Sequence, residues 1–225
     1  MALAHQKGVR AFSITDHDTI DGIKALLQLP MNGGPEWLSG VEISCEPPDE
    51  FRTLGSIHLL GYGFSIYDRQ LNRILEKAKA ARENRNPKII EKLNSLGVEI
   101  SFAEVEARFG ADQMGRPHIA ELLKEKGVVQ TFDEAFDRYL AKGKPGYVNK
   151  YKISCEKAIN IIRQAGGIPV LAHPGLLELK TDGLESFLDI LIGYGLEGME
   201  VYYTDHDEET TRTLHAMAEK KFLMI

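Results

Sequence analysis

Cysteine and long apolar runs are scarce in this sequence. Only two cysteines, Cys45 and Cys155, occur among the 225 residues. They are too few for a disulfide framework and lack the paired spacing of a zinc finger, so we interpret them as reduced, buried thiols. No uninterrupted apolar run reaches the roughly 20 residues that span a bilayer, and the N-terminus has no signal-peptide pattern. These absences favour a cytoplasmic protein that does not bind membranes.

An excess of positive charge is missing as well. The chain has 27 Lys and Arg against 33 Asp and Glu, which gives a net charge of -6. General binding to duplex DNA needs clustered cations and is therefore not expected, so a polyanionic substrate would need a local basic pocket. The remaining composition, 43% hydrophobic and 27% charged, is that of an ordinary globular protein with one large domain or two small ones.

Short apolar segments bounded by glycine alternate with helical patterns in the first and last thirds of the chain. The apolar segments predict buried strands at residues 9–14, 38–44, 57–62, 168–172, 198–203 and 222–225. Ser154 is a predicted N-cap for the helix that precedes the strand at 168–172. Helices that alternate with wholly apolar strands predict a parallel sheet with helices outside, in an α/β barrel or an open doubly wound sheet.

The middle of the chain shows only helical spacing. Capping boxes begin at Ser101 and Thr131, and each predicts a further short helix. Pro87 is expected to start a new helix or to kink the one it lies in. We therefore expect an all-helical insert over residues 66–147.

Several predicted strands contain, or are followed by, a histidine or glutamate of the kind that binds metal ions. In parallel α/β folds, functional side chains gather at the carboxyl ends of the strands. A lone residue of this kind is more often structural, but here independent strands share the feature, which favours a metal site. Imidazole and carboxylate without thiolate suit Mn²⁺, Fe²⁺ or Zn²⁺ at a hydrolytic centre. The residues are His17, Glu42, His58 and His173.

The motifs around these residues resemble those of the polymerase and histidinol phosphatase (PHP) superfamily, in order and in spacing. They are Thr15–Asp18, Gly40–Ser44, His58–Tyr62 and Ala172–Pro174. In the insert, Arg82–Arg85, Gly115–Ala120 and Gly143–Val148 resemble the branch that contains nucleoside 3',5'-bisphosphate phosphatase and ribonuclease AM. The resemblance implies an incomplete distorted (βα)7 TIM-like barrel at residues 1–65 and 148–225, with an all-helical insertion domain at 66–147.

The same resemblance implies roles for individual residues. His17, Glu42, His58 and His173 match ligands of a divalent metal cluster, usually manganese, and Asp16 matches a catalytic position that orients His17 or a water. The insert would supply phosphate contacts, for which the planar fork of a guanidinium is well suited. Those contacts fall to Arg82, Arg85, Arg116 and His118. Without the resemblance, the arginines would be a solvated helix face and His118 a hydrogen bonder at a helix start. His206 would at best lie at the rim of the site.

Two motifs of the family have no counterpart in this chain. The family opens with Asp-x-His-x-His-Ser, expected just before Met1, and closes with Gly-Ser-Asp-x-His, expected just after Ile225. Part of the ligand set is therefore missing. We expect either a truncated protein or a degenerate family member, and we expect the 225-residue chain by itself to be nearly inactive.

The activity implied by the resemblance is hydrolysis of a nucleotide phosphate ester. The substrate would be a 3',5'-bisphosphonucleoside that loses its 3'-phosphate, or a short RNA trimmed from its 5' end. Histidinol phosphatase or another small phosphomonoesterase is the alternative enzyme. A non-catalytic scaffold is a further alternative, as is a DNA-binding module built on short helices near Val105 and Ile119. The acidic balance disfavours the DNA-binding module.

Overall fold

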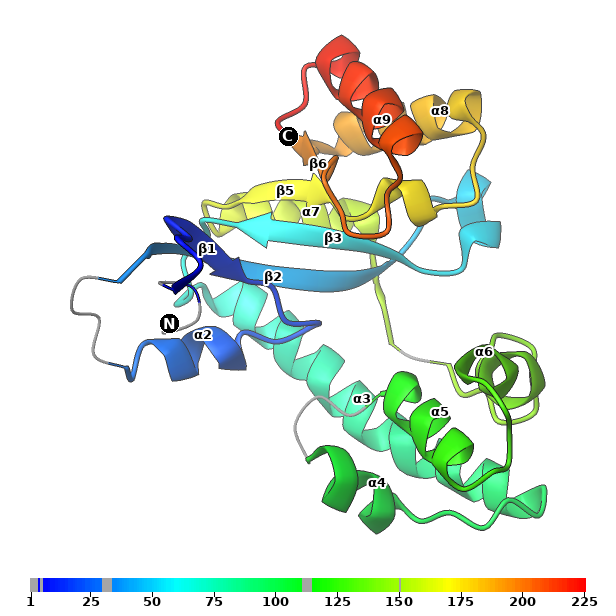
Figure 1. Cartoon of the computed structure of the whole chain (residues 1–225). Coiled ribbons are helices and arrows are strands. Elements are labelled where there is room, and N and C mark those ends of the chain that lie inside the picture. The colour runs from blue at the N-terminus through cyan, green and yellow to red at the C-terminus, as the bar shows by residue number, and fades with distance from the viewer. Residues whose placement is uncertain (1–3, 5, 30–33, 111–114, 150) are drawn as a thin grey trace. The chain divides into compact units, whose positions relative to one another are not determined.

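The computed structural model describes residues 4, 6–29, 34–110, 115–149 and 151–225. Helices and strands alternate at both ends of the chain, and helices fill the middle (Figure 1). In chain order the elements are β1 (Ala11–Ile14), α2 (Asp21–Leu26), β2 (Glu36–Glu46), the 3-10 helix η1 (Asp49–Leu54), β3 (Ile57–Tyr62), α3 (Arg69–Ser95), α4 (Phe102–Phe109), α5 (Arg116–Glu125), α6 (Phe132–Ala135), the π-helix η2 (Phe136–Leu140), β4 (Ile153–Ser154), α7 (Cys155–Gln164), β5 (Ile168–Leu171), the 3-10 helix η3 (Pro174–Leu176), α8 (Thr181–Tyr194), β6 (Gly198–Met199) and α9 (Glu208–Lys221).

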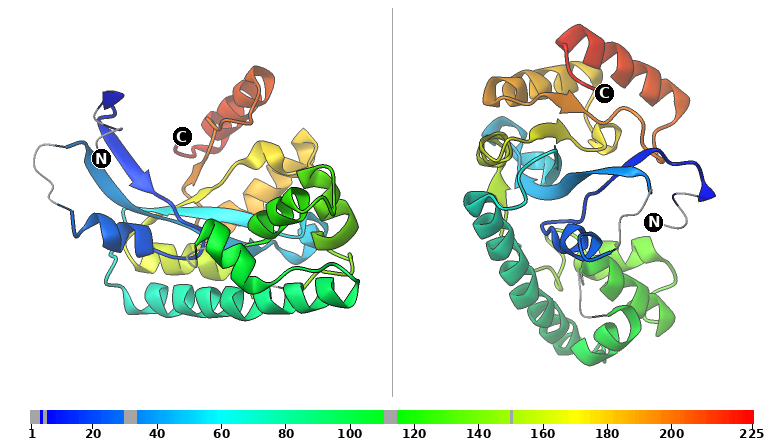
Figure 2. Two further views of the ribbon diagram at one scale, coloured as in Figure 1. Left: turned by 60° about the horizontal axis from the view of Figure 1, so that its bottom comes forward. Right: turned by 90° about the vertical axis from the view of Figure 1, so that its left-hand side faces the viewer.

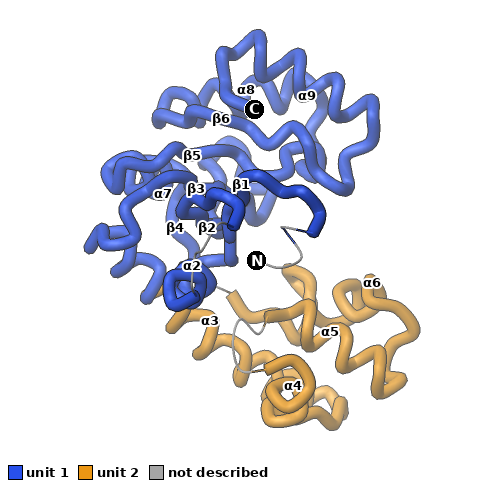
Figure 3. Tube along the Cα trace, turned by 60° about the vertical axis from the view of Figure 1, so that its left-hand side comes forward, with its two compact units in different colours: residues 1–76, 152–225 blue, residues 77–151 orange. Residues whose placement is uncertain are grey.

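The chain divides into two compact units. Unit 1 comprises Met1–Glu76 and Lys152–Ile225, and unit 2 comprises Lys77–Tyr151 (Figure 3). Each unit has a hydrophobic core of its own. The sequence placed the insert at residues 66–147, somewhat earlier, because helical periodicity begins before the chain leaves unit 1: Leu71 and Ile74 on α3 belong to the core of unit 1.

The strands of unit 1 form a mixed sheet. Its order is β1-β2-β3-β5-β6, and β4 pairs with β2. The pairs β1–β2, β2–β4 and β5–β6 are parallel, whereas β3 is antiparallel to both β2 and β5. The expectation of a parallel sheet is thus wrong at β3. The connection from β2 to β3, residues 47–56, is too short for the crossover helix that a parallel pair requires, so the chain simply turns back.

Strand β2 separates the core of unit 1 from the face that carries the candidate ligands. Val41, Ile43 and Cys45 are at most 1% exposed and lie in the core, and α7 packs against β2, β3 and β5 (Figure 2). Because side chains alternate along a strand, Glu42 and Ser44 point to the opposite face.

The helices of unit 2 begin largely where local signals predict. Ser101 Oγ accepts a hydrogen bond from the Glu104 amide while Glu104 Oε2 accepts one from the Ser101 amide, so the predicted capping box is confirmed. Thr131 Oγ1 likewise accepts from the Glu134 amide. Pro87 does not start a new helix, because α3 continues through it. Over the described ranges, no helix combines the length and apolarity needed to cross a membrane.

Candidate metal centre

His17 and Glu42 lie side by side because the loop after β1 is tied to β2. The Glu42 amide donates to Asp16 O at 3.1 Å, and Glu42 O accepts from the Asp18 amide at 2.8 Å. The loop is also held by Asp18, which is 2% exposed and adopts the left-handed conformation (φ 57°). Its carboxylate accepts from the amide and the hydroxyl of Ser44, at 2.8 and 3.0 Å. His17 Nδ1 consequently lies 3.4 Å from Glu42 Oε2.

His58 and His173 reach the same carboxylate from the other side. In the antiparallel register His58 is opposite Ser44, which places it on the face of the sheet that carries Glu42. His58 Nδ1 lies 2.8 Å from Glu42 Oε1, and His173 Nε2 lies 3.2 Å from that oxygen and 3.1 Å from His58 Nδ1. One carboxylate oxygen thus faces His17 and the other faces His58 and His173.

The electrostatics of the cluster favour an ionised Glu42. Burial by itself would raise its pKa, but hydrogen bonds from His173 and His58 and the nearby His17 lower the pKa to about 2. The hydrogen bond to Glu42 in turn raises the pKa of His173 above its usual value, against the effect of burial. An ionised carboxylate among imidazoles is a donor set of nitrogen and oxygen without sulfur, which suits a divalent cation of intermediate hardness. His17, Glu42 and His58 offer ligand atoms that lie within 4.8 Å of one another.

Comparison with known proteins agrees with this geometry. No protein-family model matches the chain. The chain is 30% identical over 198 residues to a 5'-3' exoribonuclease of Haemophilus influenzae, covering 88% of this chain and 70% of that protein. The chain belongs to the PHP superfamily. It is also 29% identical over 214 residues to a 3',5'-nucleoside bisphosphate phosphatase of Chromobacterium violaceum, covering 91% of this chain and 71% of that protein. A solved Bifidobacterium adolescentis protein, assigned to the metal-dependent phosphoesterases, superposes with a TM-score of 0.82 at 28% identity, covering 99% of this PHP chain and 77% of that one.

The structure brings four of the predicted site residues of this PHP protein into one cluster, namely His17, Glu42, His58 and His173. Asp16 borders the cluster through its main chain, while its side chain points to the start of α2 and Oδ2 accepts from the Gly22 amide at 3.2 Å. Asp16 therefore shapes the loop that carries His17.

The predicted phosphate-binding residues all lie in unit 2, where Arg116 and His118 make local contacts. Arg116 donates to Leu140 O at 2.9 Å, and its guanidinium lies within 6 Å of two aromatic ring centres. His118 Nδ1 accepts from the Gly115 amide at 3.1 Å, which is the helix-start bond considered from the sequence. Arg82 and Arg85 lie three residues apart on α3, and Arg85 is 7% exposed and donates to Asn86 Oδ1.

Sequence reasoning missed polar residues that follow β6. Glu200 Oε2 accepts from the His173 amide at 2.7 Å, and the Tyr203 ring centre lies 5.4 Å from that of His173. The charge of Glu200 also acts on Tyr62, the last residue of β3. Burial, together with the charges of Glu200 and Glu42, raises the pKa of the Tyr62 hydroxyl to about 12. Glu200 closes an apolar strand just as the predicted ligands do, so the same criterion could have found it. It was overlooked because the strand was expected to continue to residue 203.

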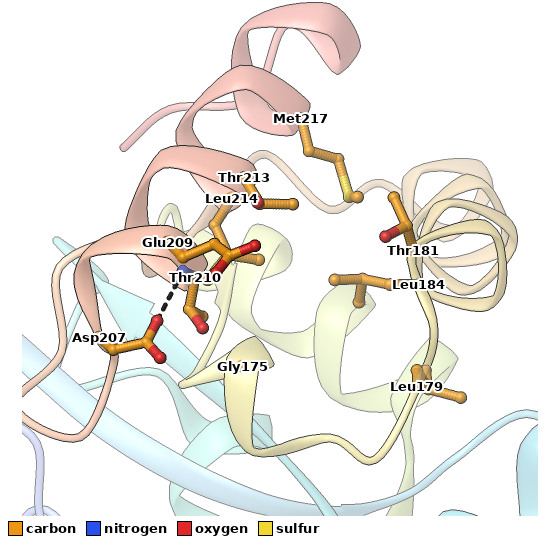
Figure 4. Close-up of a pocket in the computed structure, with 10 residues that line it drawn as sticks. All are labelled: Gly175, Leu179, Thr181, Leu184, Asp207, Glu209, Thr210, Thr213, Leu214 and Met217. Atoms are coloured by element: carbon orange, nitrogen blue, oxygen red, sulfur yellow. Dashed lines mark hydrogen bonds between the residues drawn. The ribbon is translucent and has the colours of Figure 1, made fainter.

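A separate hollow of about 250 Å³ lies between η3, α8 and α9. Aliphatic and threonine side chains line most of it, and Asp207 accepts from the Thr210 amide at the start of α9 (Figure 4). Gly175 borders the hollow, and its amide donates to His206 Nε2 at 3.2 Å. His206, expected at most at the rim of the site, therefore holds the loop that follows His173.

Proposed function

We propose that this PHP protein hydrolyses phosphate esters of nucleotides with the help of divalent cations. The observation that supports this most directly is the convergence of His17, Glu42, His58 and His173, which come from four separate segments of unit 1. The two relatives, an exoribonuclease and a nucleoside bisphosphate phosphatase, suggest the substrate class. The substrate is a 3',5'-bisphosphonucleoside that loses its 3'-phosphate, or a short RNA degraded from its 5' end. Unit 1 is the incomplete, distorted barrel of this proposal, and unit 2 is its insertion domain.

Glu42 is the central residue of the proposed centre. Its lowered pKa keeps it ionised even in mildly acidic solution, so both oxygens are available as ligands there. The imidazoles of His17, His58 and His173 can bind a cation only in their deprotonated form, and their contacts with Glu42 orient the rings toward the proposed site. When bound, a divalent cation lowers the pKa of water and neutralises charge on the phosphoryl oxygens. Mn²⁺ is our first choice, with Zn²⁺ or Fe²⁺ as alternatives.

The remaining predicted residues have supporting roles in the proposal. Asp16 orients His17 through the loop that they share. Arg82, Arg85, Arg116 and His118 would bind the substrate phosphates. Because Arg116 also supports the fold of unit 2, Arg116→Lys separates the two roles: loss of stability alone lowers the melting temperature, whereas loss of a phosphate contact raises KM.

Phosphate release tests the proposed function. The chain is incubated with Mn²⁺ and either adenosine 3',5'-bisphosphate or histidinol phosphate, next to Glu42→Gln and to the control His215→Ala. His215 lies on α9, outside the Glu42 cluster, where it pairs with Glu219 and its ring centre lies 6.5 Å from that of Tyr202. We expect release from the bisphosphate by the chain and the control, however weak, and none by Glu42→Gln. Equal release by Glu42→Gln, or a preference for histidinol phosphate, would contradict the proposal.

A further inference from the structure

The hydrogen bonds between β5 and β6 change from a main-chain acceptor to a side-chain acceptor at His173. Leu171 is in parallel register with Met199, and Leu171 O accepts from the Glu200 amide at 2.9 Å. In a regular parallel ladder, the next bond would run from the His173 amide to the main-chain carbonyl of Glu200. The His173 amide instead donates to the side chain of that residue, at 2.7 Å from Oε2. The carboxylate thus takes the place of the carbonyl at the point where β5 ends.

The main chain bends sharply at His173, where the side chain of Glu200 replaces its carbonyl as hydrogen-bond acceptor. His173 adopts the left-handed conformation with φ 32°, which costs a residue with a Cβ about 1–2 kcal/mol. A short bond to a charged acceptor is stronger than a neutral amide bond and can offset that cost. The bend takes His173 out of the strand while its Nε2 reaches Glu42 and His58.

A second tie holds the same loop from the same side. His206 Nδ1 lies 2.9 Å from Val201 O and donates to it, so the neutral ring presents Nε2 as an acceptor to the Gly175 amide. The Tyr203 ring lies between the two histidines, with ring centres 5.4 Å from His173 and 5.3 Å from His206. Residues 200–206 therefore hold the main chain on either side of Pro174.

We propose that Glu200 is a positioning residue. Its carboxylate, and not its main-chain carbonyl, accepts the hydrogen bond from the His173 amide. This bond fixes the left-handed bend that directs the His173 imidazole to Glu42. The proposal rests on the proposed function only in that the directed imidazole is a metal ligand. Glu200 itself need not touch the cation, and its role is exerted through His173.

The test compares Glu200→Leu, which removes the acceptor, with Glu200→Gln, which keeps an amide oxygen there. Glu197→Leu is the matched control, because Glu197 precedes β6 and its side chain pairs with Arg163 at the surface. The Mn²⁺ affinity of each 225-residue chain is measured by calorimetry. We expect Glu200→Leu to weaken binding about 10- to 100-fold, as is usual when a residue that supports a ligand is lost, and the other two to stay within a few-fold of the parent.

A double-mutant cycle shows whether Glu200 acts through His173. If it does, Glu200→Leu costs little further affinity once His173→Ala is present, and the two changes are strongly non-additive. Additive losses, or an unchanged affinity in Glu200→Leu, would overturn the proposal.

A measurement without metal separates this inference from the proposed function. In the metal-free chain, the amide proton of His173 should resonate downfield and exchange slowly, and it should lose both properties in Glu200→Leu but keep them in Glu200→Gln. If the parent chain binds no Mn²⁺, the proposed function fails while this amide signal still decides the positioning role. An amide signal that is the same in all variants would refute it.

Discussion

Replacing Glu42 with glutamine should remove a defined part of the pH dependence of stability. Glu42 has its pKa lowered from 4.5 to about 2 in the folded chain, and its side chain is only 14% exposed, so solvent screens it little. At about 1.4 kcal/mol for each pH unit, this difference corresponds to roughly 3 kcal/mol of folding free energy. Because the folded chain keeps the carboxylate charged to lower pH than the unfolded chain does, this stabilisation is complete above pH 4.5 and disappears as the pH falls through 2.

The histidines determine what happens at higher pH. The pKa of His173 is raised by its hydrogen bond to Glu42, so its contribution is complete below its unfolded value of 6.5 and is lost as the pH rises through the raised value. In Glu42→Gln, a protonated His173 loses its carboxylate partner. The variant should therefore be least stable relative to the parent near pH 5, and the gap should narrow toward pH 2 and again toward pH 8.

Urea unfolding in the presence of EDTA measures this gap. The fluorescence of Trp37, the single tryptophan, reports unfolding of unit 1, whose core it packs against. Glu197→Gln is the control, since its surface pair with Arg163 should contribute less than about 1 kcal/mol. Parallel stability curves for Glu42→Gln and the parent between pH 2.5 and 8 would refute the reasoning.

Three further predictions concern the loops of the centre and its metal. Asp18→Ala should cost about 1–3 kcal/mol in urea unfolding because it strips the Ser44 amide and hydroxyl of a buried acceptor, whereas Asp18→Asn, which tolerates the left-handed φ, should cost less. Gly175→Ala should destabilise the fold by about 1–3 kcal/mol, since a Cβ there would lie 2.8 Å from the His206 ring. Gly193→Ala in α8 should stabilise the fold by roughly 0.5–1 kcal/mol, because a Cβ there would meet nothing within 4 Å. Melting temperatures equal to that of the parent chain would contradict both predictions. Mn²⁺ affinity measured across pH should fall as the pH drops through the raised pKa of His173, because a protonated imidazole cannot bind a cation; an affinity independent of pH would exclude His173 as a ligand.

His58 shows how the sequence can predict a site residue on partly incorrect grounds. It was selected as a residue of a parallel strand, but it lies near the start of an antiparallel one. It still reaches Glu42, because the beginning of an antiparallel strand lies beside the end of its neighbour. Apolar patterning reveals that a segment is a strand and not which way it runs, since direction depends on the path of the connection. For this reason the placement of His58 beside Glu42 survives the error in strand direction, and its role as a ligand stays a prediction.

Glu200 shows the opposite case: the sequence can mark it as the end of an apolar strand, but no local pattern reveals which residue it contacts. Its carboxylate meets an amide 27 positions earlier in the chain, and this contact exists only because β5 and β6 pair in one particular register. Sequence periodicity can suggest that residues 198–203 are extended. It cannot show that pairing stops at Met199 and that a side chain then replaces the main chain.

The sequence by itself determined the features that arise from neighbouring residues: most strand segments, the helix starts at Ser101 and Ser154, and the set of imidazole and carboxylate groups suited to a divalent cation. The strand expected at 222–225 is wrong, because the structure forms only an isolated bridge at Met224 there. Only the tertiary structure decided the direction of β3, the division near Glu76, and the bend at His173 that brings its imidazole to Glu42 and His58. Local signals act over a few residues through caps and side-chain alternation. Strand direction and ligand convergence depend instead on contacts between distant segments, whose geometry is set when the chain packs.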